Sequence, residues 1–239
     1  MAYTTEVLTE SHVKSRSRGQ RLATRLSLRC LSRFMVVLGL LSFVCLLVAI
    51  GTDYWYIINV SEHSHNFSAS QSSHTGLWRV CHYESQCRPL VNPFKSAGNL
   101  TLSQMHIINL RAAFLLLLPL SVMIMVVSSV LGVIGLLARA HRLLLVTASL
   151  LMFGAMTTLS GVCTYVAYST AGYREAVRLL LAQSQGGSKA LLEHVDIRFG
   201  WSLALACLSL VGETLTGIAL LAAAWRLSHG RAGREDQGL

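Results

Sequence analysis

The stretch Gly200–Trp225 reads GWSLALACLSLVGETLTGIALLAAAW and contains one ionisable side chain, Glu213. About 20 helical residues cross a hydrocarbon core roughly 30 Å thick, so this stretch is long enough to span a membrane. Three more apolar runs carry no charged side chain, at residues 34–50, 112–137 and 143–168. Because lipid offers no water to backbone polar groups, we predict transmembrane helices over about 34–51, 112–137, 143–168 and 200–225.

The composition agrees with a membrane protein and excludes other classes. Charged residues make up 13% of the 239 and hydrophobic residues 53%, whereas a soluble domain carries about 25% charged residues. So little charge cannot cover a soluble surface, and the apolar content excludes disorder along the whole chain. The alternating segments of a membrane β-barrel are also missing. We expect an all-α membrane domain over 34–225, a basic segment over 1–33 and a short tail over 226–239.

The distribution of basic residues predicts the orientation. Twelve of the 20 Lys and Arg residues lie in the short segments 1–33, 138–142 and 226–239, and the two long connections, 52–111 and 169–199, hold the others. Basic residues concentrate on the cytosolic side, so we expect both termini inside and both long connections outside the cell. The first apolar run could instead be a cleaved signal sequence, although a leader is seldom preceded by 33 residues. Cleavage would remove one helix without changing the sidedness.

Two features of the long connections test this orientation. Asn59, Asn66 and Asn99 stand in Asn-x-Ser/Thr sequons within the first connection, and such sequons are glycosylated only on the lumenal side. Cys81 and Cys87 are the only cysteines of the two connections, whereas the other four lie in or beside predicted helices. An isolated pair in an oxidising compartment indicates a disulfide bond. We therefore predict an N-glycosylated outer loop that contains one disulfide.

The outer connections contain segments with their own structural signals. Residues 53–60 (DYWYIINV) and 75–83 (TGLWRVCHY) are rich in aromatic and β-branched residues, which favours two strands. We expect residues 105–110 to extend the second helix beyond the membrane. The second connection contains a helical pattern at 173–183 (YREAVRLLLAQ), which we expect to break at Gly186 and Gly187 and to resume toward Phe199.

Seven positions resemble the W…GLW…C…C…R pattern of the claudin superfamily, which includes the PMP-22/EMP/MP20/claudin type: Trp55, Gly76, Leu77, Trp78, Cys81, Cys87 and Arg111. Segments 74–81 (HTGLWRVC) and 199–202 (FGWS) are similar to those of calcium-channel gamma subunits and the related glutamate-receptor regulators. Segments 89–94 and 195–205 are similar to the subgroup that contains transmembrane proteins 114 and 235. The resemblance implies a left-handed bundle of four helices with internal termini. It also implies an extracellular antiparallel sheet built mostly from the first loop.

Each motif residue has a structural and a functional interpretation. Trp55 and the Gly76–Trp78 element either anchor the sheet at the membrane interface or form an edge that binds a partner. Arg111 donates hydrogen bonds to loop carbonyls or to a lipid phosphate, or else recognises a ligand. Cys30, beside the first helix, is a candidate for palmitoylation. Pairs of small residues four apart favour close helix contacts within the bundle, with contact between copies in a homo-oligomer as the alternative.

Glu213 is the one ionisable residue within the predicted spans. Such a group is costly in a bilayer unless it is protonated or paired. Three hypotheses explain its presence: a hydrogen bond within the bundle, contact with a partner's helix, and a proton relay. For the first we expect a hydroxyl of the third helix as partner, such as Thr157, Thr158 or Ser160.

Other chemistries receive little support from the sequence. Arginines four apart in the basic segment would form a stripe that binds anionic lipid if the segment is helical, or else only mark the cytosolic side. Nucleic-acid binding is not expected from so short a basic segment. Histidines of the first loop could bind zinc but are more often solvated. No nucleophile–base set, carboxylate pair or phosphate loop appears, so we expect no enzyme, no cofactor and no metal.

The resemblance therefore leads to a functional hypothesis. We expect a non-enzymatic four-pass protein of the plasma membrane, in contact with membrane lipids, that docks laterally against a channel or receptor subunit. Its third and fourth helices and its sheet would make the contact. The alternative is a claudin-type cell-contact protein that meets neighbours in cis and trans at epithelial apical or lateral membranes and cell junctions. An ion pathway through the bundle is the third hypothesis, supported by Glu213 alone.

Overall fold

The computed structural model describes residues 33–60, 73–82, 87–90, 101–138, 140–183 and 195–235. Several predicted sites lie outside these ranges: Cys30, Asn66 and Asn99, together with most of the basic segment. Asn59 lies within a described strand, but its side chain is not described.

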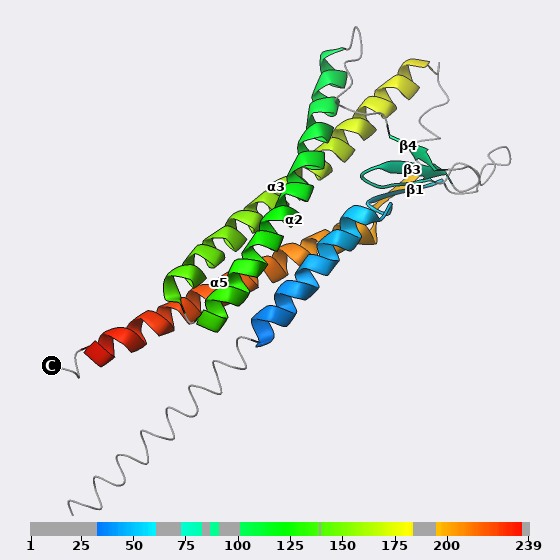
Figure 1. The fold of residues 1–239 in the computed structure, drawn as a ribbon. Helices are drawn as coiled ribbons and strands as arrows, with labels where there is room; N and C mark the ends of the chain where they lie inside the picture. The colour runs from blue at the N-terminus through cyan, green and yellow to red at the C-terminus, as the bar shows by residue number, and fades with distance from the viewer. Residues whose placement is uncertain are drawn as a thin grey trace, which may run out of the picture.

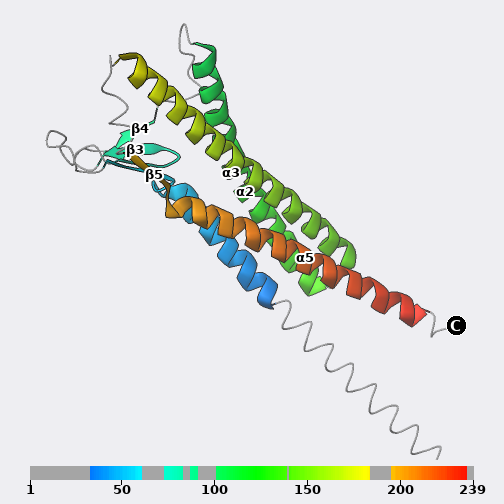
Figure 2. The same cartoon turned by 180° about the vertical axis from the view of Figure 1, so that it is seen from behind.

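Four helices in the described ranges are long and apolar enough to cross a membrane. The first helix spans Arg33–Gly51, and α2 spans Leu102–Ala138. Helix α3 spans His141–Gln183, and α5 spans Trp201–Glu235. The four predicted spans are confirmed. The start of the first helix and the end of α5 lie at one end of the bundle, and a small sheet lies at the other (Figures 1 and 2).

Helices α2 and α3 extend beyond the predicted spans on the side of the sheet. At 1.5 Å per residue, the 37 residues of α2 reach about 55 Å, well beyond the thickness of a hydrocarbon core. Helix α2 begins earlier than residue 112 because Thr101 and Gln104 form a reciprocal capping box, with N–H to side-chain distances of 3.3 and 3.4 Å. The ends of α2 and α3 on this side diverge from each other (Figures 1 and 2).

The sheet has five antiparallel strands in the order β4-β3-β2-β1-β5. The first connection supplies four of them, and the fifth comes from the second connection. Their bounds are as follows: β1 Tyr56–Val60, β2 Ser73–Thr75, β3 Arg79–His82, β4 Arg88–Pro89 and β5 Val195–Phe199. The prediction of a small sheet built mostly from the first loop is confirmed.

Two expectations about the connections were wrong in detail. The segment before Phe199 is a strand and not a resumed helix, because VDIRF alternates apolar and polar residues and pairs with β1 along its full length. The segment 75–83 is divided between β2 and β3 by a turn in which the Gly76 N–H donates to the Arg79 carbonyl over 2.9 Å. At Gly76 a Cβ would lie 2.6 Å from the Asp53 Cα, so only glycine fits this approach.

The buried apolar side chains form two clusters along the bundle. The cluster near the sheet includes Trp55, Phe114 and Tyr165, and the cluster at the opposite end includes Leu144 and Leu220. Small residues lie where helices cross: a Cβ on Gly132, Gly161 or Gly212 would contact a side chain of a neighbouring helix within 3.2 Å. The predicted role of the small residues in close packing within the bundle agrees with these contacts.

Candidate functional site

The motif tryptophans Trp55 and Trp78 cap the C-terminal end of the first helix. The last carbonyls of a helix have no partner within it. The Trp55 indole N–H donates to the Ala49 carbonyl over 2.6 Å, and that of Trp78 donates to the Ile50 carbonyl over 3.0 Å. Trp55 is fully buried and packs against Tyr165, with ring centroids 4.7 Å apart. This geometry gives both tryptophans a structural role at the junction of sheet and bundle.

Aromatic side chains also surround the outside of this junction. Tyr54 stacks on His74, with ring centroids 4.5 Å apart, and on Trp201 at 5.6 Å. Trp78, Trp201 and Phe199 are each about half exposed. Such a ring of aromatic side chains at one end of the spans is typical of the interface between lipid and water.

The junction also contains polar side chains. Tyr56 of β1 meets Phe199 edge-on, and burial raises the pKa of its hydroxyl above the ordinary value. Asp53 forms an ion pair with Arg79 over 3.2 Å. Arg111 is only 9% exposed, and within the described part of the chain its Nε has no hydrogen-bond partner. The predicted contact of Arg111 with loop carbonyls or a lipid phosphate therefore stays a prediction.

The structure contains the predicted disulfide. Cys81, at the end of β3, is bonded to Cys87, which directly precedes β4. The bond links these two paired strands, and the Cys81 side chain is buried. Leu77, from the same motif, is also buried and belongs to the apolar cluster beneath the sheet.

Glu213 lies inside the bundle with 1% of its surface exposed. The Thr158 hydroxyl lies 3.3 Å from both carboxyl oxygens, and the Ser209 hydroxyl lies 3.4 Å from one of them. Of the three hydroxyls expected as partners, Thr158 is the one in contact. Thr157 and Ser160 donate instead to carbonyls of their own helix.

A count of protons around Glu213 indicates which group donates. Each hydroxyl has one proton, and each has a carbonyl acceptor nearer than the carboxyl: the Gly154 carbonyl at 3.1 Å for Thr158 and the Ser42 carbonyl at 2.8 Å for Ser209. A protonated carboxyl that donates to Thr158 gives each of these protons an acceptor and avoids a buried charge in lipid. The geometry therefore favours the hydrogen bond within the bundle over contact with a partner's helix.

The same polar layer joins the first helix to α5. The Ser42 hydroxyl donates to the Ser209 carbonyl over 2.5 Å, and the Ser209 hydroxyl donates back to the Ser42 carbonyl over 2.8 Å. Gly212 makes the approach possible, because a Cβ there would lie 2.7 Å from the Ser42 Oγ. We call this reciprocal pair the serine clasp.

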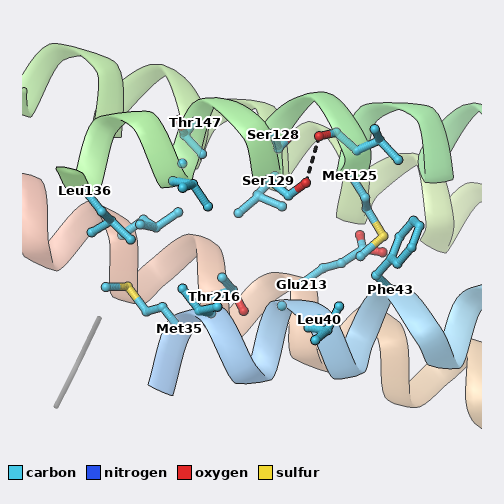
Figure 3. A pocket seen from close by; sticks show the side chains of 17 residues that line it. Met35, Leu40, Phe43, Met125, Ser128, Ser129, Leu136, Thr147, Glu213 and Thr216 are labelled. Atoms are coloured by element: carbon cyan, nitrogen blue, oxygen red, sulfur yellow. Dashed lines mark hydrogen bonds between the residues drawn. The ribbon is translucent and has the colours of Figure 1, made fainter. Parts of the chain in front are cut away.

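Beside the clasp, an apolar groove of about 440 Å³ opens between the first helix and α2 (Figure 3). Glu213 and Thr216 of α5 lie at its floor, and Met35, Phe43 and Met125 are among its walls. Among the described residues, no group of three or more His, Cys, Asp or Glu side chains could hold a metal ion.

Four membrane-length helices with a disulfide-bonded sheet, built mostly from the connection between the first two, define a four-pass membrane protein of claudin architecture. Residues 40–222 match the sequence profile of the family described as PMP-22/EMP/MP20/claudin tight junction, and the chain belongs to this family. A voltage-dependent calcium channel gamma-1 subunit from Sus scrofa is 25% identical over 227 residues. The match covers 86% of this chain and 90% of that protein.

Proposed function

We propose that the protein is a non-enzymatic, four-pass accessory subunit or organiser of a channel or receptor in the plasma membrane. The observation that carries the proposal is the similarity, over 86% of the chain, to a protein named as a calcium channel subunit. The absence of a motif for catalysis in the sequence agrees with such a role. We further propose that both termini are cytosolic, that the sheet is extracellular, that the three sequons are glycosylated and that Cys30 is palmitoylated.

The outer faces of α3 and α5 are the surface that we propose for docking. Phe153 and Met156 lie one turn apart on α3 and are about 60% exposed, and Leu208 and Val211 are more than half exposed on α5. Helices α3 and α5 pack against each other, and we propose that one partner contacts both exposed faces. Glu213 points inward from the same helix, so this surface carries no ionisable side chain at mid-membrane.

Proximity labelling in the native tissue, followed by mass spectrometry, tests the accessory role. We expect an ion channel or receptor among the enriched proteins. The variant Phe153→Ala/Met156→Ala should reduce that enrichment, because it truncates the α3 face. Leu116→Ala/Leu120→Ala is the matched control, since it truncates two comparably exposed side chains of α2. Enrichment without any channel or receptor, or equal loss in both variants, would contradict the proposal.

The alternative is a claudin-type cell-contact protein, which the tight-junction description of the matching family favours. In a mixed culture, such a protein concentrates where two expressing cells meet and leaves the boundary with a non-expressing neighbour unlabelled. Equal labelling of both boundaries would exclude this role while leaving the accessory role intact.

A further inference from the structure

The groove beside the serine clasp is large enough for a ligand. Its volume of about 440 Å³ falls within the roughly 300–1,000 Å³ of small-molecule sites. Gly39 and Gly132 line it and account for part of its depth. At its rim, Leu40 of the first helix is 62% exposed and Val133 of α2 is about half exposed, so the groove opens toward the lipid.

The length of the groove matches one leaflet. Its lining on the first helix runs from Met35 to Phe43, which is about 12 Å at 1.5 Å per residue. Half of a hydrocarbon core about 30 Å thick is about 15 Å. One end of the groove lies at Glu213, midway along the membrane-spanning part of α5. The other end, which we call its mouth, lies at the membrane surface away from the sheet.

The mouth of the groove, at the membrane surface away from the sheet, is basic. Arg33, Arg142 and Arg226 lie two, five and six positions beyond the nearest groove-lining residue of their own helices, within about 10 Å along the helix axes. All three side chains are exposed. No aspartate or glutamate side chain that the structure describes lies at this end, and the ion pairs Asp53–Arg79 and Glu175–Arg178 lie at the sheet end.

We propose that the groove binds one acyl chain of an anionic phospholipid, with the lipid phosphate beside these three arginines. The apolar walls accommodate the chain, and the charge at the mouth selects the headgroup. The carboxyl of Glu213 is already hydrogen-bonded to Thr158. The end of an acyl chain, which has no polar group, can therefore lie beside it. The site does not depend on the accessory role proposed above.

Photolabelling of the purified full-length protein in nanodiscs tests the site. The probe is phosphatidylserine with a diazirine near the end of one acyl chain, compared with phosphatidylcholine carrying the same chain. We expect phosphatidylserine to label groove residues of the first helix and α2 several-fold more than phosphatidylcholine does. Each change Arg33→Gln, Arg142→Gln or Arg226→Gln should lower this labelling by about five-fold. Arg178→Gln, on the sheet side, is the matched control and should leave it unchanged.

A second set of variants fills the groove without changing charge. A Cβ on Gly39 would lie 3.7 Å from the Thr216 methyl, an ordinary contact, so Gly39→Leu directs its side chain into the groove. Gly51→Leu is the control on the same helix, because nothing lies within 4 Å of a Cβ there. We expect at least a five-fold loss of labelling for Gly39→Leu alone. Leu40→Trp at the rim replaces it if Gly39→Leu fails to fold by circular dichroism.

Three results would overturn the proposal. Equal labelling by the two lipids means that bulk lipid fills the groove without selection. Unchanged labelling in both groove-filling variants means that the acyl chain lies elsewhere. Crosslinks between chains in place of lipid adducts mean that a second copy of the protein occupies the groove.

Discussion

The serine clasp predicts that Gly212→Ala destabilises the bundle far more than the same change five residues away. The added Cβ would lie 2.7 Å from the Ser42 Oγ and 3.1 Å from the Ser42 Cβ. Overpacking of this kind costs about 1–3 kcal/mol, and rotation of Ser42 would forfeit an interhelical hydrogen bond of about 0.6 kcal/mol. We expect a loss of about 2 kcal/mol in the free energy of unfolding.

Gly217→Ala is the matched control at a second buried glycine of α5, which faces Met152 of α3 and not the first helix. Its Cβ would meet the Met152 sulfur at 3.0 Å, and a flexible methionine side chain can move aside. Both variants gain the same helix propensity from glycine to alanine, so the difference between them reports the clasp. The assay is unfolding by sodium dodecyl sulfate in mixed micelles, followed by circular dichroism and tryptophan fluorescence.

A double-mutant cycle identifies Ser42 as the cause. Removing the hydroxyl with Ser42→Ala leaves room for the new methyl group, so Gly212→Ala should cost about 1 kcal/mol less in that background. Equal costs in both backgrounds, or equal stabilities of Gly212→Ala and Gly217→Ala, would refute the reasoning.

Three further predictions concern the sheet and its orientation. Trp55→Phe removes the indole donor and leaves the Ala49 carbonyl with only the Thr52 hydroxyl at 3.4 Å, so the melting temperature should fall by an amount equivalent to about 1–3 kcal/mol; an unchanged melting temperature counts against the cap. Replacing Cys81 and Cys87 together by serine should lower stability by about 2 kcal/mol for so short a loop, and in the unmodified protein an impermeant thiol reagent should label them only after reduction. Asn66→Gln and Asn99→Gln should each remove one glycan, seen as a gel shift that glycosidase treatment abolishes; a chain without glycans in cells would contradict the proposed orientation.

The four spans were predictable because lipid imposes a strong and local requirement. A run of about 20 apolar residues is sufficient to indicate a helix, and the breaks between runs are polar. The extension of α2 to Leu102 had a readable signal as well, since Thr101 and Gln104 have the spacing of a capping box. The helical pattern over 173–183 predicted the end of α3 at Gln183, but it did not predict that residues 169–172 join this segment to the third span as one helix.

Long-range pairing explains what the sequence could not reveal. Strand β5 forms against β1, more than 130 residues earlier in the chain, and its five residues are too few to distinguish a strand from a helix. The partner of Glu213 was expected among the hydroxyls of the third helix, but the choice of Thr158 depends on how α3 and α5 are rotated toward each other. The groove had no signal at all, because it is formed by the separation of two helices and not by a motif.

The attachment of the sheet has a mechanical consequence. Two short connections join the sheet to the bundle, Thr52–Trp55 after the first helix and Gly200 before α5. The Gly200 N–H also donates to the Trp55 carbonyl over 3.0 Å, so the two connections are tied to each other. A pull on the sheet is therefore transmitted first to the first helix and α5, which the serine clasp makes move as a pair. A force on the sheet therefore acts on these two helices, which form one wall and the floor of the groove.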